Sequence, residues 1–236
     1  TKVCIFGAGA IGGYIAACLS KTKVKLSLIA RGPHKEAIEK KGLTFIKDKK
    51  IENLKLTVTD DPKTLEDDVR KNMAAQGNTV VELANRGGRW GIVKDSPFNR
   101  RITPNTPMEI TGPAAGHELM KTSADPSGTR CLGTWNNCAN GSTPWGTYLT
   151  CEENFNGYYS SSDPDYPLLA EKKRYGIGHK DRGYGWATID DRFDISKEPN
   201  ESNRNGYVVE YDPADPNFTP NKRTALGRFK HEMRKL

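Results

Sequence analysis

Residues 136–159, NNCANGSTPWGTYLTCEENFNGYY, decide the fold predicted for most of this chain. The run Trp145–Glu152 has the aromatic and β-branched composition of a strand, and Gly, Pro and Asn residues bound it. The same stretch gathers cysteine, adjacent acids, asparagines and aromatics in one turn-rich segment. It therefore predicts an extended, turn-punctuated fold and marks a candidate polar site.

The alternation of short extended runs with turns continues over residues 67–236. Only Asp67–Gln76 and Ala114–Lys121 have helical spacing, and Asn85–Gly88 predicts a hairpin turn. This pattern predicts a mainly-β region, layered or arranged as a partial β-propeller, although no internal repeat is visible. The further strand candidates are residues 78–83, 89–95, 131–135, 185–191 and 206–212.

The first 66 residues have a different pattern, in which strand and helix signals alternate. Strand-like runs at 2–6 and 23–29 enclose helical spacing over 11–20, and a second helix is predicted over 33–41, ending at Gly42. This order predicts a βαβ unit, hence an α/β Rossmann-like fragment.

A Gly-rich turn joins the first strand to the first helix, which is the context that makes a GxGxxG pattern informative. Such glycines let the backbone approach a pyrophosphate at a helix N-terminus. An arginine at the end of the second strand favours a ribose 2′-phosphate, so NADP is the predicted cofactor. The alternative is that the Gly-rich turn only connects strand and helix and that the arginine is a solvated surface charge. The predicted cofactor-binding residues are Gly7, Gly9, Ala10, Ile11, Gly12 and Arg31.

The two stretches also differ in composition. Residues 1–66 have twelve Lys and one Arg, whereas residues 67–236 have ten Lys, thirteen Arg and all four Trp. Charge chemistry does not require that switch, because both side chains solvate a surface well. We therefore predict two regions of different origin, 1–66 and 67–236, joined near residue 67.

Of the net charge of +7, +6 lies in residues 1–66, which carry 13 basic and 7 acidic side chains. No nucleic-acid partner is predicted, because the tryptophans are not interleaved with that basic region. No apolar stretch is long enough to span a bilayer, and no signal peptide precedes the first strand, so a cytoplasmic location is expected for the sequence as given. The five cysteines contain no CxxC pair, and the oligomeric state stays open.

The residues alone give a limited prediction for the polar segment 136–159. Thiolate and carboxylate together can hold a transition metal such as iron, and carboxylate and amide oxygens suit calcium. Turn caps and packed aromatics are the structural alternative, and Trp145 and Trp186 are expected in the core. His117, His179 and His231 are expected to be surface or packing groups.

The stretch KVCIFGAGAIGGYIAACLS, followed by LIARG, resembles the start of ketopantoate reductases as far as about Glu66. That resemblance implies NADP(H) binding and reduction of a keto acid. The family's catalytic residues come from beyond this region, so no reductase turnover is expected. An NADP-dependent reductase fragment is one alternative, and a non-enzymatic nucleotide- or metal-binding module is another.

Four segments between residues 69 and 232 resemble the PhoX family of alkaline phosphatases in family order. They include LGTWNNCANGSTPWGTYLTCEENFNGYY and RTALGRFKHE. The resemblance implies a secreted or periplasmic phosphomonoesterase, a six-bladed β-propeller, and a site of iron and calcium ions. By motif, Cys138 and Glu232 match metal ligands, and Glu153 is the expected third ligand in preference to Glu152.

These resemblances together predict an incomplete metal-dependent phosphomonoesterase fused to a dinucleotide-binding segment. We expect weak or absent catalysis, because the remaining ligands of the phosphatase family would lie beyond Leu236. No catalytic residue is assigned from the sequence.

Overall fold

The computed structural model describes residues 2–6, 9–30, 32–47, 50–59 and 62–231. The chain forms two compact units, Thr1–Asn72 and Met73–Leu236, and helix α3 (Pro62–Ala75) runs from the first into the second. The predicted domain identities, 1–66 and 67–236, stay predictions.

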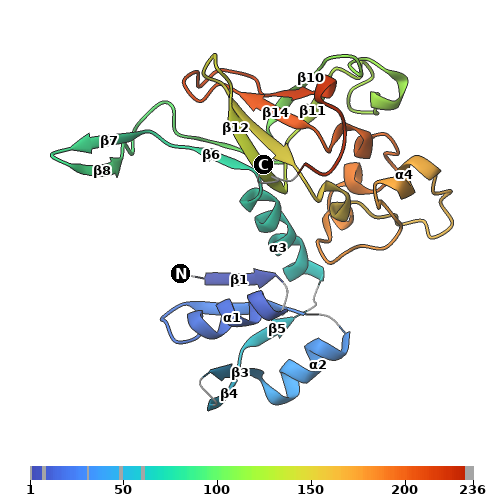
Figure 1. The fold of residues 1–236 in the computed structure, drawn as a ribbon. Helices are drawn as coiled ribbons and strands as arrows, with labels where there is room; N and C mark the ends of the chain where they lie inside the picture. Colours follow the sequence, from blue (N-terminus) through green and yellow to red (C-terminus); the bar gives the residue numbers. More distant parts are fainter. Residues whose placement is uncertain (1, 7–8, 31, 48–49, 60–61, 232–236) are drawn as a thin grey trace. The chain divides into compact units, whose positions relative to one another are not determined.

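The first unit is built on a three-stranded parallel sheet in the order β1-β2-β5, formed by Lys2–Phe6, Lys25–Ile29 and Thr57–Thr59. Helices α1 (Ala10–Leu19) and α2 (Gly32–Lys41) alternate with these strands, as the sequence predicts (Figure 1). A hairpin of β3 (Leu43–Lys47) and β4 (Lys50–Leu54) is inserted before β5.

The core of the first unit is small because its sheet has three strands. The fully buried Ala16 of α1 packs with Leu28 of β2, since alanine lets a helix approach a sheet closely. Ile5, Ala30, Ile38 and Leu43 complete this core. A complete dinucleotide-binding sheet has six strands, so this unit does not establish the predicted Rossmann fold.

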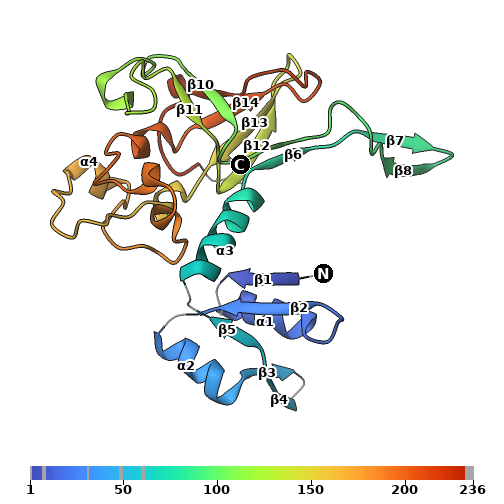
Figure 2. The ribbon, with the colours of Figure 1, turned by 180° about the vertical axis from the view of Figure 1, so that it is seen from behind.

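The second unit contains a six-stranded sheet in the order β11-β10-β15-β14-β13-β12. Its neighbours are antiparallel except for β10 and β15, which run parallel. The strands are β10 (Pro107–Thr111), β11 (Arg130–Leu132), β12 (Asn137–Ser142), β13 (Tyr148–Glu152), β14 (Val208–Tyr211) and β15 (Asn221–Arg223). Figure 2 shows this sheet from the opposite side.

Two apolar groups stabilise the second unit. One includes Met108, Ile110 and Val209, which lie on β10 and β14. The other is aromatic: the buried Trp135 ring lies 5.2 Å from Phe193 and 5.6 Å from Trp186, measured between centroids. Buried aromatic rings in edge-to-face arrangements stabilise a core beyond their area alone.

Short helices and loops occupy most of the sequence between β13 and β15. They are α4 (Ala170–Arg174) and the 3-10 helices η2 (Phe155–Tyr158), η3 (Trp186–Thr188), η4 (Asp191–Phe193) and η5 (Glu201–Arg204), and a further 3-10 helix, η6 (Thr224–Leu226), follows β15. The strand predicted over 185–191 is therefore wrong, because Trp186 turns into the aromatic core instead of alternating along a sheet. Another 3-10 helix, η1 (Glu118–Met120), replaces the longer helix predicted over 114–121.

A two-stranded arm extends from the second unit (Figure 1). Strand β6 (Asn78–Val80) pairs with β9 (Arg100–Ile102), and β7 (Leu83–Arg86) pairs with β8 (Arg89–Ile92) about the predicted turn. Trp90 of this arm is 70% exposed, and Trp145, expected in the core, is 72% exposed. Together the two units have a mixed α/β architecture in which sheet predominates. They contain no closed barrel among the described residues, and the partial propeller is not established.

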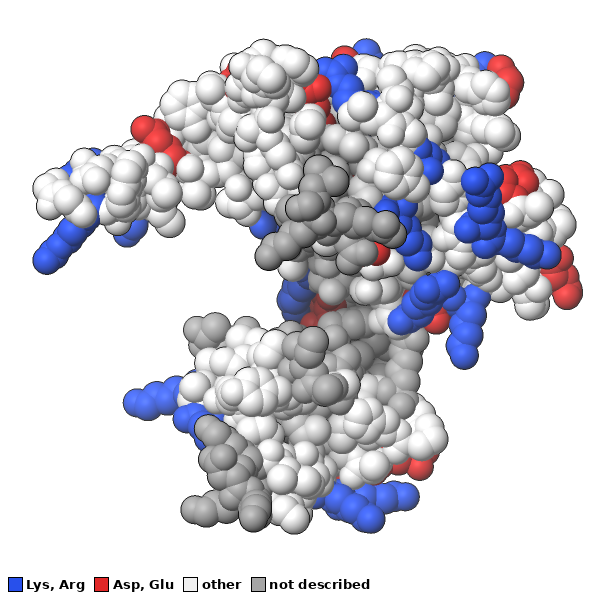
Figure 3. Space-filling view, in the orientation of Figure 1, with Lys and Arg blue, Asp and Glu red and all other residues white. Residues whose placement is uncertain are grey.

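Charged side chains are dispersed over the surface. On the face in Figure 3, basic side chains lie in separate groups, and no continuous basic stripe is visible. No described helix has the length and apolar character needed to cross a membrane.

Candidate metal centre

The predicted ligand Cys138 lies in a β-bulge of the β12–β13 hairpin. The register shifts between Asn137 and Asn140, so two residues of β12 oppose the single residue Cys151 of β13. Bulges of this kind redirect a side chain and are frequent beside functional sites. The Cys138 thiol is on an exposed residue, where an incoming ion can reach it.

Asn136 organises the open end of the hairpin, next to the predicted ligand Glu153. Its φ of 49° is in the left-handed region, which asparagine tolerates better than most residues. Its carbonyl accepts from the Glu153 N–H at 2.9 Å, and its Oδ1 accepts from the Asn154 N–H at 2.9 Å. Its amide group donates to the Tyr158 hydroxyl at 3.0 Å. These contacts fix the chain at Glu153 relative to the start of β12.

The adjacent acids Glu152 and Glu153 have different environments. Glu152 is fully buried, and its Oε1 accepts from Lys222 Nζ at 2.9 Å. Its Oε2 accepts from the backbone N–H groups of Gly206 and Tyr207 at 2.7 and 3.2 Å. Glu153 is half-buried, and its carboxylate accepts from Asn154 Nδ2. Glu152 is therefore committed to the core, and Glu153 is the acid that remains accessible to an ion.

A third segment, residues 229–231, reaches the same hairpin. The Phe229 N–H donates to the Gly206 carbonyl at 3.1 Å, and the His231 N–H donates to the Glu152 carbonyl at 3.2 Å. The described chain thus ends against β13, one residue before Glu232. Glu232 itself lies outside the described residues, and its predicted role as a ligand stays a prediction.

Two buried polar atoms next to Glu152 have no hydrogen-bond partner in the described part of the chain, Oδ1 of Asn137 and Nε2 of His231. Asn137 pairs directly with Glu152 across the hairpin. Burial lowers the pKa of His231, so its imidazole is held in the neutral form that binds metals. An unpaired buried polar group costs free energy. Nitrogen and oxygen donors therefore lie beside Glu152, and the same hairpin carries the Cys138 thiol. These donor types suit a transition metal and calcium.

The structure brings Cys138 and Glu153 to one hairpin but does not assemble a complete ligand set. Within the described ranges, no group of three or more histidine, cysteine or acidic side chains is arranged to hold a metal. Sequence reasoning assigned no binding role to Asn137 or His231, because their unpaired atoms become visible only once the fold is known.

The predicted nucleotide site lies in the first unit. Gly9 is the N-cap of α1, and its carbonyl accepts from the Gly13 N–H at 2.7 Å. A cavity of about 430 Å³ opens at this helix start, between Gly9, Tyr14, His34 and Phe45. Gly12 is half-buried on α1. Gly7 and Arg31 lie outside the described residues, as do the side chains of Ala10 and Ile11 on the same helix.

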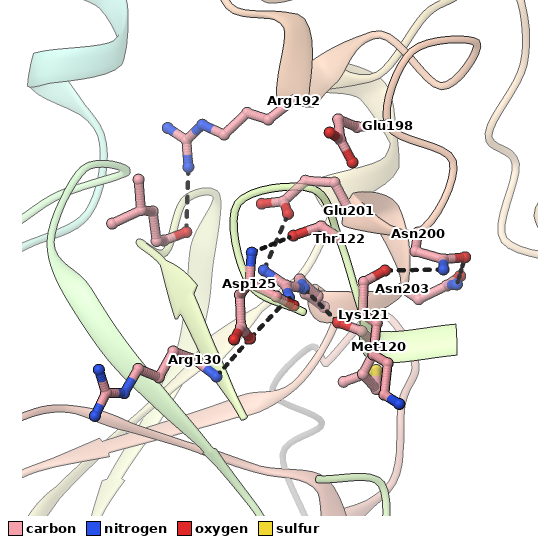
Figure 4. Close-up of polar contacts among 12 residues, drawn as sticks. Met120, Lys121, Thr122, Asp125, Arg130, Arg192, Glu198, Asn200, Glu201 and Asn203 are labelled. Atoms are coloured by element: carbon pink, nitrogen blue, oxygen red, sulfur yellow. Dashed lines mark hydrogen bonds and ion pairs between the residues drawn. The ribbon is translucent and has the colours of Figure 1, made fainter. Parts of the chain in front are cut away.

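A separate cavity of about 740 Å³ lies beside β10 and β11 in the second unit. Figure 4 shows polar contacts beside this cavity, including those of Asp125 and Glu201. Arg204 donates to Asp125 at 3.0 Å and lies 3.4 Å from Glu201, and Arg192 donates to Asp190 at 2.8 Å. Burial raises the pKa of Glu201. These pairs tie residues 120–125 to η5 and give the charged groups a structural explanation.

Comparison with known proteins shows the family of this chain. A sequence model of the family "Alkaline phosphatase PhoX" matches residues 35–236, which is most of the chain. The chain belongs to the PhoX family.

A solved relative agrees with that assignment. The structure of Pseudomonas fluorescens PhoX in complex with vanadate, a transition state analogue, superposes with a TM-score of 0.69 at 56% sequence identity. The alignment covers 70% of this chain and 29% of that one. The chain therefore spans less than a third of the length of its solved relative.

A second similarity is short. A 2-dehydropantoate 2-reductase of Mesorhizobium japonicum is 56% identical over 48 residues, which are 20% of this chain and 15% of that protein. This segment does not establish a reductase, nor does it establish a fusion of two proteins.

Proposed function

We propose that the second unit is part of a metal-dependent phosphomonoesterase of the PhoX type, in which Cys138, Glu153 and Glu232 hold metal. The observation that carries the proposal is the convergence of the bulged β12–β13 hairpin with residues 229–231, beside two buried polar atoms that have no partner. Family membership supports the same reading.

Bound iron and calcium would neutralise phosphate oxygens and stabilise the charge that develops during phosphoryl transfer. The residues of this chain would hold these metal ions and orient the side chains that bind them. The bulge presents the Cys138 thiol, Asn136 fixes the backbone at Glu153, and the pair Glu152–Lys222 anchors β13 beneath them. Because the chain spans 29% of its solved relative, we expect hydrolysis to be weak or absent even where metal binds.

Metal binding is the direct test, because it does not require turnover. The purified chain, stripped with chelator and reloaded with iron under reducing conditions, is expected to retain iron after desalting. Cys138→Ser should lower the retained iron at least tenfold, whereas Cys18→Ser, which removes an exposed thiol of the first unit, should leave it unchanged. Equal retention by wild type and Cys138→Ser would refute the assignment.

Hydrolysis of p-nitrophenyl phosphate with iron and calcium present measures the remaining activity. Any activity that depends on both metals and is lost in Glu153→Gln supports the phosphomonoesterase. Activity that persists without metal contradicts it.

We also propose that the first unit binds NADP(H) at the Gly9 turn, and that the chain is a fusion joined near residue 67. The short reductase similarity and the cavity at the start of α1 support this second function. Saturable NADPH binding that is lost in Gly9→Val is the expected result. Gene sequence reads that fail to cross the codons of residues 60–75 would contradict a natural fusion.

A further inference from the structure

The bulge at Cys138 sets two thiols opposite each other. Asn137 pairs with Glu152, and Asn140 pairs with Thr150. These two pairs share one face of the hairpin because side chains alternate along a strand. The residues between them, Cys138 on one strand and Cys151 on the other, therefore occupy the other face. Cys138 shares the place opposite Cys151 with Ala139, and residues facing each other across an antiparallel ladder have Cα atoms about 4.5–5.5 Å apart, close to the span that a disulfide bridges.

The two thiols differ in accessibility. Cys138 is exposed and Cys151 is half-buried, and both are free thiols. The Cys138 thiol is therefore the more accessible of the two to an oxidant in solution, and the Cys151 thiol lies on the neighbouring strand.

We propose that Cys138 and Cys151 form a reversible cross-strand disulfide, which withdraws Cys138 from metal binding. The second part of this statement rests on the proposed function, whereas formation of the disulfide does not. The bulge thereby makes the candidate metal centre sensitive to the thiol–disulfide state of its surroundings.

The oxidant is a small disulfide such as glutathione disulfide. The Cys138 thiolate attacks one sulfur of that disulfide, and the first glutathione leaves as a thiolate. Cys151, after losing its proton, attacks the Cys138 sulfur of the mixed disulfide and releases the second glutathione. Two protein thiols are oxidised, one small disulfide is reduced to two thiols, and the leaving thiolates take up the protons.

The other two cysteines whose side chains are described lack this arrangement. Cys131 is buried on β11, at the opposite edge of the six-stranded sheet from β12, and burial raises its pKa to about 11. Cys18 is exposed on α1 of the first unit. It serves as the matched control, because it is an accessible thiol without an opposed partner on a neighbouring strand.

The test uses the full chain, stripped of metal and equilibrated with glutathione disulfide in excess of glutathione. After acid quenching and alkylation, chymotrypsin separates the two cysteines by cutting at Trp145 and Tyr148, and mass spectrometry identifies linked peptides. We expect a Cys138–Cys151 link that consumes two of the five thiols, and glutathione as the adduct on the exposed Cys18. Cys18→Ser should keep the link, and Cys151→Ser should stop at glutathione on Cys138. Five intact thiols in wild type, or glutathione on Cys138 without the link, would overturn the disulfide.

Preloading with iron separates this inference from the proposed function. If Cys138 holds iron, the loaded chain should form the link at least tenfold more slowly than the stripped chain. Equal rates would retain the disulfide and reject its coupling to metal, along with Cys138 as a ligand. Absence of the link in the stripped chain would reject the disulfide, whatever the iron measurement gives.

Discussion

Replacing Lys222 tests whether a buried ion pair stabilises the centre of the second unit. Its ammonium is fully buried and donates to Glu152 at 2.9 Å, to the Arg204 carbonyl at 2.9 Å and to Asn205 Oδ1 at 2.5 Å. In Lys222→Met the Glu152 carboxylate keeps only two backbone donors in a site that excludes water. Removing one partner of a buried pair costs about 3–5 kcal/mol.

The magnitude can be checked by tryptophan fluorescence during urea unfolding, which gives the free energy, and during thermal unfolding, which gives Tm. All four tryptophans lie in the second unit, and Lys222 Nζ lies 5.5 Å from the centre of the buried Trp135 ring. For a unit of this size each kcal/mol shifts Tm by about 2–4 °C, so Lys222→Met should lower Tm by roughly 6–20 °C.

Two further variants make this prediction refutable. Lys197→Met removes an exposed pair with Asp191 and should cost less than about 1 kcal/mol. The double change Lys222→Met with Glu152→Gln should recover more than half of the loss, because no unpaired charge remains buried. If Lys222→Met destabilises no more than Lys197→Met, the buried pair does not stabilise this unit.

Three other substitutions have defined outcomes. Lys172 is 4% exposed, and burial lowers its pKa from 10.5 to about 8. Between pH 8 and 10.5 the unfolded chain therefore binds more protons than the folded chain. The unfolding free energy of wild type should rise by about 3 kcal/mol relative to Lys172→Met across that window, as measured by urea unfolding at each pH. Gly206→Ala should destabilise the second unit by more than about 2 kcal/mol, because φ is 93° and the added Cβ would lie 2.4 Å from the Phe155 ring. The control Gly87→Ala has φ 61° but open space around the added Cβ, and it should lose about 1 kcal/mol in the same assay. Arg204→Met should cost more than about 2 kcal/mol in thermal unfolding by leaving Glu201 buried without its cation, and a cost equal to that of the exposed Arg130→Met would contradict this.

Local patterns in the sequence predicted many of the elements. The Gly-rich turn placed a strand before α1, the Gly87–Gly88 turn placed the β7–β8 hairpin, and the run 206–212 contains β14. These predictions hold because turn chemistry and strand composition act over a few residues. The prediction of a strand over 185–191 is wrong because a tertiary contact, and not the local sequence, determines the structure there. Burial of Trp186 against Trp135 outweighs its local preference for an extended chain.

The sequence likewise predicted some features of the candidate site and could not reveal others. Motif resemblance singled out Cys138 and preferred Glu153 to Glu152, and the structure gives a reason for that preference in the Lys222–Glu152 pair. The sequence could not reveal that pair, because its members are 70 residues apart. It also could not reveal the bulge, since the register of two strands depends on both of them at once.

The sequence by itself thus determined the family, the alternation of short strands with turns, and the residue types able to bind metal. Tertiary structure alone decided which acid is committed to the core, that Cys138 faces Cys151, and that Asn137 and His231 have buried atoms without partners. Composition and spacing act locally along the chain. Burial, pairing register and charge compensation arise only when distant segments meet.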